Sequence, residues 1–275
     1  MLKTNNTNFS SYEYMEDELK FFINSKVRIK ILNCLLYGSF SMTEIHKIAN
    51  LTYSSISINI KKLEERGYIT QKSGKYQINN LIKMKLQDIV DFNDSINVLK
   101  EYYSFWFNHN TESIDIESLN SISQLKTSKI IESDPSDIYK THNYFKDLLK
   151  ESKYVKSIFP FIHPEYHRIF EDLMKKKVNI EFLLLRSISN SFIKSMDRNL
   201  TKTALKEKKL EIKSLDNVEF ALTVANNFVS FGLFKVDNSF DQNKILISFT
   251  KEAIDWGNKT FELYKANGKR LYLGL

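Results

Sequence analysis

The sequence predicts an N-terminal winged helix-turn-helix with a small β-hairpin wing, a long linking helix and a C-terminal α/β domain with a mixed sheet. Three patterns lead to this prediction. Residues 40–78 hold two capped amphipathic helices followed by two short strands. Residues 81–107 carry an apolar stripe at helical spacing. From about residue 125 onward, strands and helices alternate, as expected where helices pack on a sheet.

The two helices of the first pattern have recognisable starts. Ser41 and Thr52 stand where a side-chain oxygen can cap the first turn of a helix. After each cap, apolar residues recur at helical spacing, so each helix has one face suited to a core. These apolar positions are Ile45, Ile48 and Ala49 in the first helix, and Ile56, Ile60 and Leu63 in the second.

A hairpin follows the second helix. Gly67 comes directly after Arg66, where a residue with left-handed backbone conformation commonly ends a helix. Residues 68–70 and 76–78 have the composition of short strands, and the turn between them, residues 72–75, contains two lysines and a glycine. The sequence therefore predicts a wing with a basic tip.

The outer face of the second helix predicts contact with DNA. Its side chains are small or cationic, so the helix can enter a major groove and reach base edges and phosphates. The candidate DNA contacts are Thr52, Ser54, Ser55, Ser57, Ile58, Lys61 and Lys62 on this helix, with Lys72 and Lys75 on the wing.

The charge distribution supports the same partner. Residues 26–85 hold eleven basic and three acidic side chains, a net charge of +8, so the rest of the chain carries −1 of the total of +7. A module that displaces counterions from phosphates needs such a concentration of positive charge. The helix-turn-helix pattern alone is a weak signal, because two short amphipathic helices also occur in ordinary helical cores. The alternative to DNA binding is a winged helix used only for protein contacts.

Composition limits the class of protein. With 275 residues, 42% hydrophobic and 27% charged, the chain can form two cored domains. No apolar run is long enough to span a bilayer, and residues 1–20 lack the apolar stretch of a signal peptide, so we expect a soluble, cytoplasmic protein. The one cysteine, Cys34, lies among apolar residues of the first core helix, where we expect it to serve packing.

The stripe of residues 81–107 predicts one long helix after the wing. Such a helix can connect two copies of a DNA-binding module on a two-fold operator, so we expect a homodimer. The alternative is a helix that only covers the core of its own domain.

The remainder of the chain predicts the α/β domain. Residues 154–159 and 178–185 are strands followed by helices, which indicates parallel pairing. The next four strands are closely spaced, which favours antiparallel pairing, and a helix over residues 253–264 closes the domain. These four strands are residues 210–215, 218–224, 228–234 and 245–249. We expect Trp256 to anchor the closing helix in the core.

A ligand site is expected at one edge of this sheet. Ligands of open α/β sheets bind outside the carboxyl ends of the strands. That rule selects Ser133, Asp134, Phe161, His163, Arg186 and Ser187. Arg186 would suit an anionic molecule, although a salt bridge to a carboxylate such as Asp134 is an equal alternative. No metal is expected at His163 and His167, because Pro164 opens a helix between them, and no cofactor is predicted.

Several segments together carry a resemblance to a known family. They are VRIKILNCLL and SSISINIKKLEERGYI, which are generic to winged helices, and the more distinctive IIESDPSD, FPFIHPEYHRIFEDLM, FALTVANNFVSFGLF and AIDWGNKTFELY. The chain resembles the archaeal winged-helix regulators typified by the filamentation and methanogenesis regulator of methanogens. The second domain also resembles the phospholipase-D-like sensor domain of TrmB-type regulators, but the His-x-Lys pair of the catalytic members does not occur.

The resemblance implies a transcriptional regulator with an N-terminal DNA-binding domain and a C-terminal effector or sensor domain. We therefore expect a sequence-specific DNA-binding protein, not an enzyme, that responds to a small-molecule effector. The expected domains are residues 16–80, 81–124 and 125–266, with a tail at 267–275. Two alternatives stay open: a DNA reader fused to an enzyme that modifies a small molecule, and a regulator whose α/β domain docks on another protein.

Overall fold

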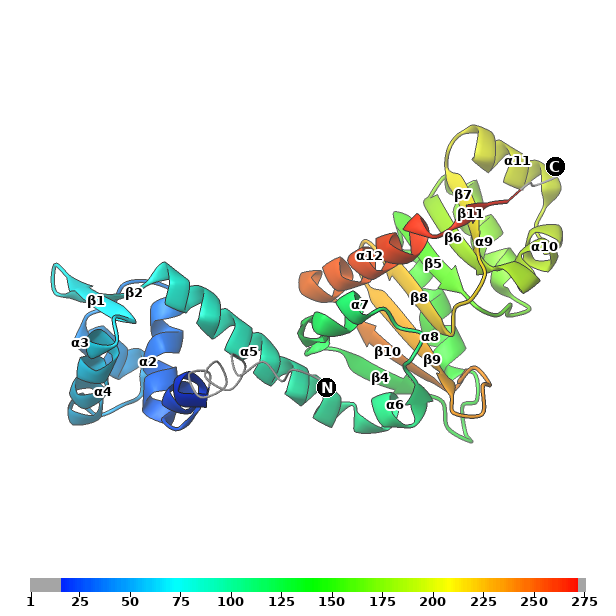
Figure 1. Ribbon diagram of the computed structural model, residues 1–275. Helices are drawn as coiled ribbons and strands as arrows, with labels where there is room; N and C mark the ends of the chain where they lie inside the picture. Colours follow the sequence, from blue (N-terminus) through cyan, green and yellow to red (C-terminus); the bar gives the residue numbers. More distant parts are fainter. Residues whose placement is uncertain (1–15, 272–275) are drawn as a thin grey trace, which may run out of the picture. The chain divides into compact units, whose positions relative to one another are not determined.

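The computed structural model describes residues 16–271 (Figure 1). The start of the chain, on which the expectation about a signal peptide rests, and the last four residues of the tail lie outside the described residues. The chain divides into two compact units between Val90 and Asp91. In the described part, no helix combines the length and the apolar character needed to cross a membrane.

The first unit consists of helices and one hairpin. A helical segment at residues 16–23 precedes α2, and the unit continues into the first half of α5. The elements are α2 (Lys26–Leu36), α3 (Met42–Ala49), α4 (Tyr53–Glu65), β1 (Ile69–Lys72), β2 (Lys75–Ile78) and α5 (Asn80–Glu101). Apolar side chains from all of these elements form one core, and Cys34 of α2 is buried beside it, as expected.

Local capping fixes the ends of α3 and α4. The Ser41 hydroxyl accepts the backbone N–H of Glu44, and the Glu44 carboxylate accepts the backbone N–H of Ser41, a complete capping box. Thr52 caps α4 by accepting the backbone N–H of Ser55. One expectation about these helices was wrong: Ile48 is 57% exposed, because it lies on the solvent side of α3.

The hairpin is closed by a tight turn. Ser73 and Gly74 have φ values of 51° and 77°, the left-handed pair that suits the twist of two antiparallel strands. Lys72 and Lys75 face each other across this turn. The hairpin therefore ends in two lysines, one on each strand.

The helix predicted over residues 81–107 is interrupted. α5 ends at Glu101, and a short helix α6 (Tyr103–Phe107) follows. Tyr102 leaves helical geometry, with φ −107° and ψ 35°. Its buried hydroxyl donates a 2.6 Å hydrogen bond to the Ser128 carbonyl, and this tertiary contact accounts for a break that the apolar stripe does not reveal.

The second unit is built on a nine-stranded sheet whose main path runs β11-β7-β6-β5-β8-β9-β10-β4, with β3 paired to β9. Its elements are β3 (His109–Asn110), α7 (Ile116–Asn120), a 3-10 turn (Ile122–Leu125), β4 (Lys129–Glu132), α8 (Lys140–Lys150), β5 (Tyr154–Phe159), α9 (Tyr166–Lys175), β6 (Asn179–Leu185), α10 (Arg186–Ser195), α11 (Arg198–Lys206), β7 (Leu210–Leu215), β8 (Phe220–Ala225), β9 (Val229–Lys235), β10 (Lys244–Ser248), α12 (Lys251–Ala266) and β11 (Lys269–Arg270).

The sheet is mixed, as expected, but one strand runs differently from the prediction. β5, β6 and β7 are parallel neighbours. The antiparallel part begins where β8 pairs with β5. β7 was expected to be antiparallel because it lies close in sequence to β8. It is parallel to β6 because α10 and α11 form the crossover that a parallel connection requires.

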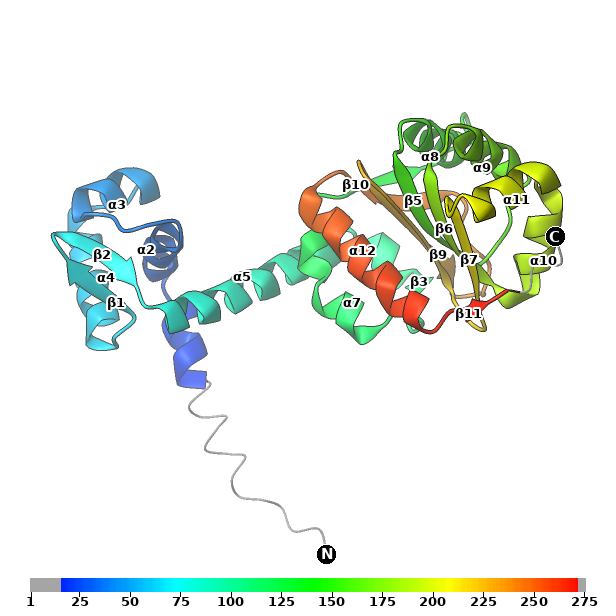
Figure 2. The same ribbon diagram turned by 90° about the horizontal axis from the view of Figure 1, so that it is seen from above.

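The two faces of β8 and β9 differ in side-chain size. Side chains alternate along each strand. The large ones at one set of positions belong to the core that α12 closes, namely Phe220, Leu222, Val224, Val229, Phe231 and Leu233. The alternate positions hold small side chains, except for Phe234 at the end of β9. Figure 2 shows α12 on one face of the sheet and α8 and α9 on the other. Trp256 of α12 is buried on the large-residue face and its ring lies edge-on to Phe231, as expected for an anchor. α12 packs closely there because Gly257 lacks a Cβ, which would lie 2.7 Å from the Val229 side chain.

Candidate functional site

The outer face of α4 is open to solvent. Ile56, Ile60 and Leu63 are buried on the inner face, so the residues half a turn away point outward. Ile58 is 58% exposed, although burying it would stabilise the unit. Of the predicted DNA contacts on α4, Ser54, Ser57, Ile58, Lys61 and Lys62 are exposed and Ser55 is half-buried.

The N-terminus of α4 holds an exposed aromatic residue, Tyr53, that was not among the predicted DNA contacts. Thr52 is exposed and its hydroxyl also donates a 2.8 Å hydrogen bond to the Ser55 hydroxyl, so its first role is the helix cap. Tyr53 follows it, stacks on the His46 ring at a centroid distance of 4.3 Å, and remains 47% exposed. The sequence signal that could have indicated Tyr53 is an aromatic residue placed directly after the helix cap.

The hairpin tip of the same unit presents two exposed lysines, Lys72 and Lys75. Lys75 lies 3.7 Å from the Glu44 carboxylate, a solvent-exposed pair of little energetic weight. Hydrogen bonds from the backbone and hydroxyl of Ser41, followed by the charge of Lys75, lower the pKa of Glu44. Within residues 16–271, no carboxylate lies within 4 Å of Lys61, Lys62 or Lys72, so these three charges are available to an anion.

Two arginines of the basic segment have a structural role instead. The guanidinium groups of Arg28 and Arg66 each lie 4.1 Å from the centre of the Phe21 ring. Arg66 also lies 3.1 Å from the Asp17 carboxylate. These contacts join residues 16–23 to α2 and α4, and they engage both cations in interactions within the first unit.

The second unit contains a cavity of about 130 Å³ between the sheet and α8. Its floor is the small-residue face of the sheet, with Ala221, Thr223, Ser230 and Gly232. Its walls are mainly aromatic and come from α8 and the turn before it, from β5, α9 and the loop between them, and from the loop between β9 and β10. The aromatic and imidazole rings are those of Tyr139, His142, Phe145, Phe159, Phe161, His163, Tyr166 and Phe240.

Two histidines form part of this wall as a stacked pair, with ring centroids 3.8 Å apart. His142 donates from Nε2 to the Glu165 carboxylate at 2.8 Å, and this bond, with the charge of Lys146, lowers the pKa of Glu165. The Nδ1 atom of His163 accepts the backbone N–H of Glu165. Burial, followed by repulsion from His142, lowers the pKa of His163, so this ring favours its neutral form with the proton on Nε2.

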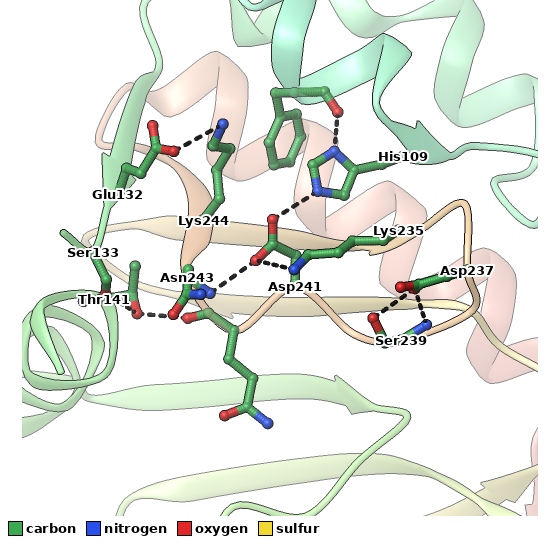
Figure 3. Close-up of polar contacts among 12 residues, drawn as sticks. His109, Glu132, Ser133, Thr141, Lys235, Asp237, Ser239, Asp241, Asn243 and Lys244 are labelled. Atoms are coloured by element: carbon green, nitrogen blue, oxygen red, sulfur yellow. Dashed lines mark hydrogen bonds and ion pairs between the residues drawn. The ribbon is translucent and has the colours of Figure 1, made fainter. Parts of the chain in front are cut away.

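The loop between β9 and β10 is held from both sides (Figure 3). On one side, Thr141 of α8 donates to the Gln242 carbonyl at 2.7 Å. On the other, the buried His109 approaches the Asp241 carboxylate with Nε2 at 3.0 Å, and its Nδ1 donates to the Phe105 carbonyl at 2.8 Å. The wall of the cavity is thereby connected to α6.

The residues predicted for the ligand site occupy different places. Phe161 and His163 line the cavity. The Ser133 hydroxyl lies 3.1 Å from that of Thr141, a lining residue. Asp134 accepts backbone N–H groups within its own turn. Arg186 forms a 3.3 Å ion pair with Asp216 instead of Asp134, and neither Arg186 nor its exposed neighbour Ser187 lines the cavity.

Sequence comparison matches both units to one family. Residues 16–97 match the model of the N-terminal domain of the methanogenesis regulatory protein FilR1, and residues 138–267 match the model of its middle domain. The FilR1 protein of Methanothrix harundinacea (strain 6Ac) is 23% identical over 261 residues, which are 94% of this chain and 58% of that relative. The chain therefore corresponds to part of the length of the curated relative.

Two solved structures align with the chain at low identity. TrmBL2, described as an archaeal chromatin protein, aligns with a TM-score of 0.43 and 15% identity, over 90% of this chain and 94% of its own. A phosphatidylserine synthase from Haemophilus influenzae Rd KW20 aligns with a TM-score of 0.39 and 9% identity, over 52% of this chain and 39% of its own. Neither alignment is close enough to assign chemistry.

Proposed function

This chain belongs to the FilR1 family of methanogenesis regulatory proteins, and from that premise we propose that it regulates transcription by binding double-stranded DNA in a sequence-specific way. One observation carries the proposal. The outer face of α4, lined with small and cationic side chains, is exposed, and the hairpin tip of the same unit presents two further exposed lysines. A helix with this surface can lie in a major groove while the hairpin contacts the adjacent backbone.

The residues of this surface divide by chemistry. Lys61, Lys62, Lys72 and Lys75 supply positive charge for phosphates, which gives affinity without sequence preference. The hydroxyls of Ser54, Ser55 and Ser57 can bond to base edges, and Ile58 can contact the methyl group of thymine. In this proposal residues 16–80 are a winged-helix DNA-binding domain, which acts in the cytoplasm where the DNA is.

We propose that α5 joins two copies of the chain. All but its first residue lie in the linking region proposed at residues 81–124. It carries four exposed apolar side chains, Leu81, Met84, Phe92 and Leu99, at spacings that place them on one helix face. Two such faces can pack against each other in a homodimer, which would present two α4 helices to a two-fold operator.

We propose that residues 125–266 sense a small molecule and have no enzymatic role, with residues 267–275 as a tail. The support is the cavity, which has a closed floor and an aromatic wall. The predicted ligand residues Phe161 and His163 line it. Ser133, Asp134, Arg186 and Ser187 do not line it, and they remain in the proposal only as residues outside the cavity. Ligand binding would change the spacing or mobility of the two DNA-binding domains.

A selection experiment tests the DNA-binding proposal. The full chain is incubated with a library of random duplexes, and the enriched duplex is titrated by fluorescence anisotropy beside a scrambled duplex. We expect the enriched sequence to bind at least ~10³-fold more tightly than the scrambled one, the lower bound for specific recognition. Equal affinity for the two duplexes at every salt concentration would contradict sequence-specific binding.

A further inference from the structure

We propose that the cavity binds an uncharged molecule built on a single aromatic ring that carries a hydrogen-bond acceptor, and that Asp241 and His109 transmit its binding to α6. This inference deepens the sensing part of the proposed function and rests on it.

The volume of the cavity sets the size of the part of the ligand that it can enclose. The cavity holds about 130 Å³. An apolar cavity of ~150 Å³ is enough to bind benzene, so one six-membered ring with a small substituent is the appropriate scale. The rings of Phe161 and Phe240 stack at 4.1 Å between centroids, and those of His142 and His163 at 3.8 Å. A wall of planar groups favours a planar ligand, which gains offset or edge contacts with them.

The lack of charged side chains in the cavity lining further restricts the class of ligand. Among the described residues, none of the side chains that line the cavity is Asp, Glu, Lys or Arg. The Glu165 carboxylate and the Lys146 ammonium, which lie next to the histidine pair, are already paired at 3.4 Å. A charged ligand would lose its hydration without finding an opposite charge, which costs several kcal/mol. The anionic ligand that Arg186 suggested therefore does not fit this cavity.

The hydrogen-bond donors that line the cavity indicate which polar group the ligand carries. His163 accepts at Nδ1, so in its neutral form Nε2–H is a donor, and this donor has no partner among the described residues. The hydroxyls of Tyr166 and Ser230, both lining residues, likewise make no hydrogen bond within the described part of the chain. A carbonyl or similar acceptor on the ligand would pair with one or more of these donors when the ligand takes the place of water against them, since a donor covered without a partner costs free energy.

The connection to α6 starts at the loop between β9 and β10. Phe240, Gln242 and Asn243 of this loop line the cavity, whereas Asp241, between them, contacts His109. The Asn243 backbone N–H donates to the other Asp241 oxygen at 3.0 Å. A ligand that displaces Phe240 or Asn243 must therefore move Asp241 or break this bond, and His109 passes the shift to the carbonyl of Phe105 in α6.

Binding is tested on the full chain without DNA. The probes are para-fluorobenzamide and para-fluoroacetophenone, compared with para-fluorobenzoate, glucose and inorganic phosphate, by fluorine NMR for the fluorinated probes and thermal shift for all. We expect the two uncharged rings to bind and to raise the melting temperature with the logarithm of concentration. The anionic ring should bind at least tenfold more weakly, and glucose and phosphate should have no effect. Failure of both uncharged rings, or preference for any comparison compound, overturns the ligand class.

Two variants locate the site. Ala221→Leu fills the floor of the cavity and should weaken binding of the uncharged rings at least tenfold. Ala266→Leu makes the same change at an exposed position of α12 and should leave binding unchanged. If Ala221→Leu does not fold, Ser230→Ala removes one unpaired donor and should weaken binding about threefold to tenfold. Unchanged binding in the cavity variants overturns the assignment of the site.

The transmission is tested by the effect of a bound ring on DNA affinity. In the wild-type chain we expect a change of at least ~5-fold, the lower range of allosteric coupling. Asp241→Asn should bind the ring normally and lose this change, and His109→Gln serves if Asp241→Asn does not fold. A retained response in these variants overturns the route, and binding without any response in the wild type overturns sensing. DNA affinity measured without the ring reports separately on DNA binding.

Discussion

Replacing Lys61 and Lys62 by alanine should lower both the DNA affinity and its dependence on salt. These two exposed lysines, with the two at the hairpin tip, are the cations that the proposed DNA surface presents. A protomer therefore offers four phosphate contacts, and a two-fold dimer offers eight. Each contact contributes about −0.9 to the slope of log K against log salt, so the wild-type slope should be about −7.

The variant dimer keeps four of the eight contacts, so its slope should be about −3.6. Between about 50 and 200 mM salt, the wild type should lose ~10⁴ in affinity and the variant only ~10². The variant should bind more weakly at low salt, and the two affinities should converge as salt rises. The affinity ratio between enriched and scrambled duplexes should change little, because phosphate contacts carry no sequence information.

Fluorescence anisotropy at four or more salt concentrations gives both slopes. The matched control is Lys175→Ala with Lys176→Ala, an adjacent exposed pair at the end of α9 that makes the same change of charge in the second unit. A control slope equal to that of the wild type would assign the effect to α4. Equal slopes for the wild type and the Lys61 and Lys62 variant would refute the reasoning, because a surface that contacts phosphates cannot lose four charges without releasing fewer counterions.

Three further predictions test other parts of the structure. Ile58→Ala should change the bases enriched in a selection at one position of each half-site and alter total affinity by less than ~3 kcal/mol, whereas an unchanged selection would show that Ile58 touches no base. Burial lowers the pKa of His163, so its contribution to stability is present above about pH 6.5 and is lost as the pH falls through the lower folded-state pKa. His163→Asn keeps an acceptor for the Glu165 N–H. Between about pH 7.5 and 5.5 its melting temperature should fall less than that of the wild type, and an identical fall would contradict a contribution of His163 to the acid sensitivity. His109→Ala leaves the buried Asp241 carboxylate without its main partner and should lower the free energy of unfolding of the second unit by ~3 kcal/mol. Both tryptophans lie in that unit, so their fluorescence during urea unfolding reports this value, and a loss below about 1 kcal/mol would show that the pair is not important for stability.

Only part of the cavity can be predicted from the sequence. The segments FALTVA and VSFGLF alternate large and small side chains, so the sequence indicates that one face of these strands is bulky and the other is not. It does not indicate whether the small face is filled by a helix or left hollow. Residues from segments far apart along the chain decide this, and only the folded chain brings Phe161 and Phe240 together.

The local features of the first unit were determined by the sequence itself. Ser41 and Thr52 cap their helices because a cap depends on residues three positions apart, and Ile56, Ile60 and Leu63 share a face because helical periodicity places them there. The tertiary structure decided the features that depend on distant partners. Tyr102 ends α5 through a bond to Ser128, β7 joins β6 through a helical crossover, and Arg186 pairs with Asp216. Such contacts follow from long-range packing, which spacing along the chain does not encode.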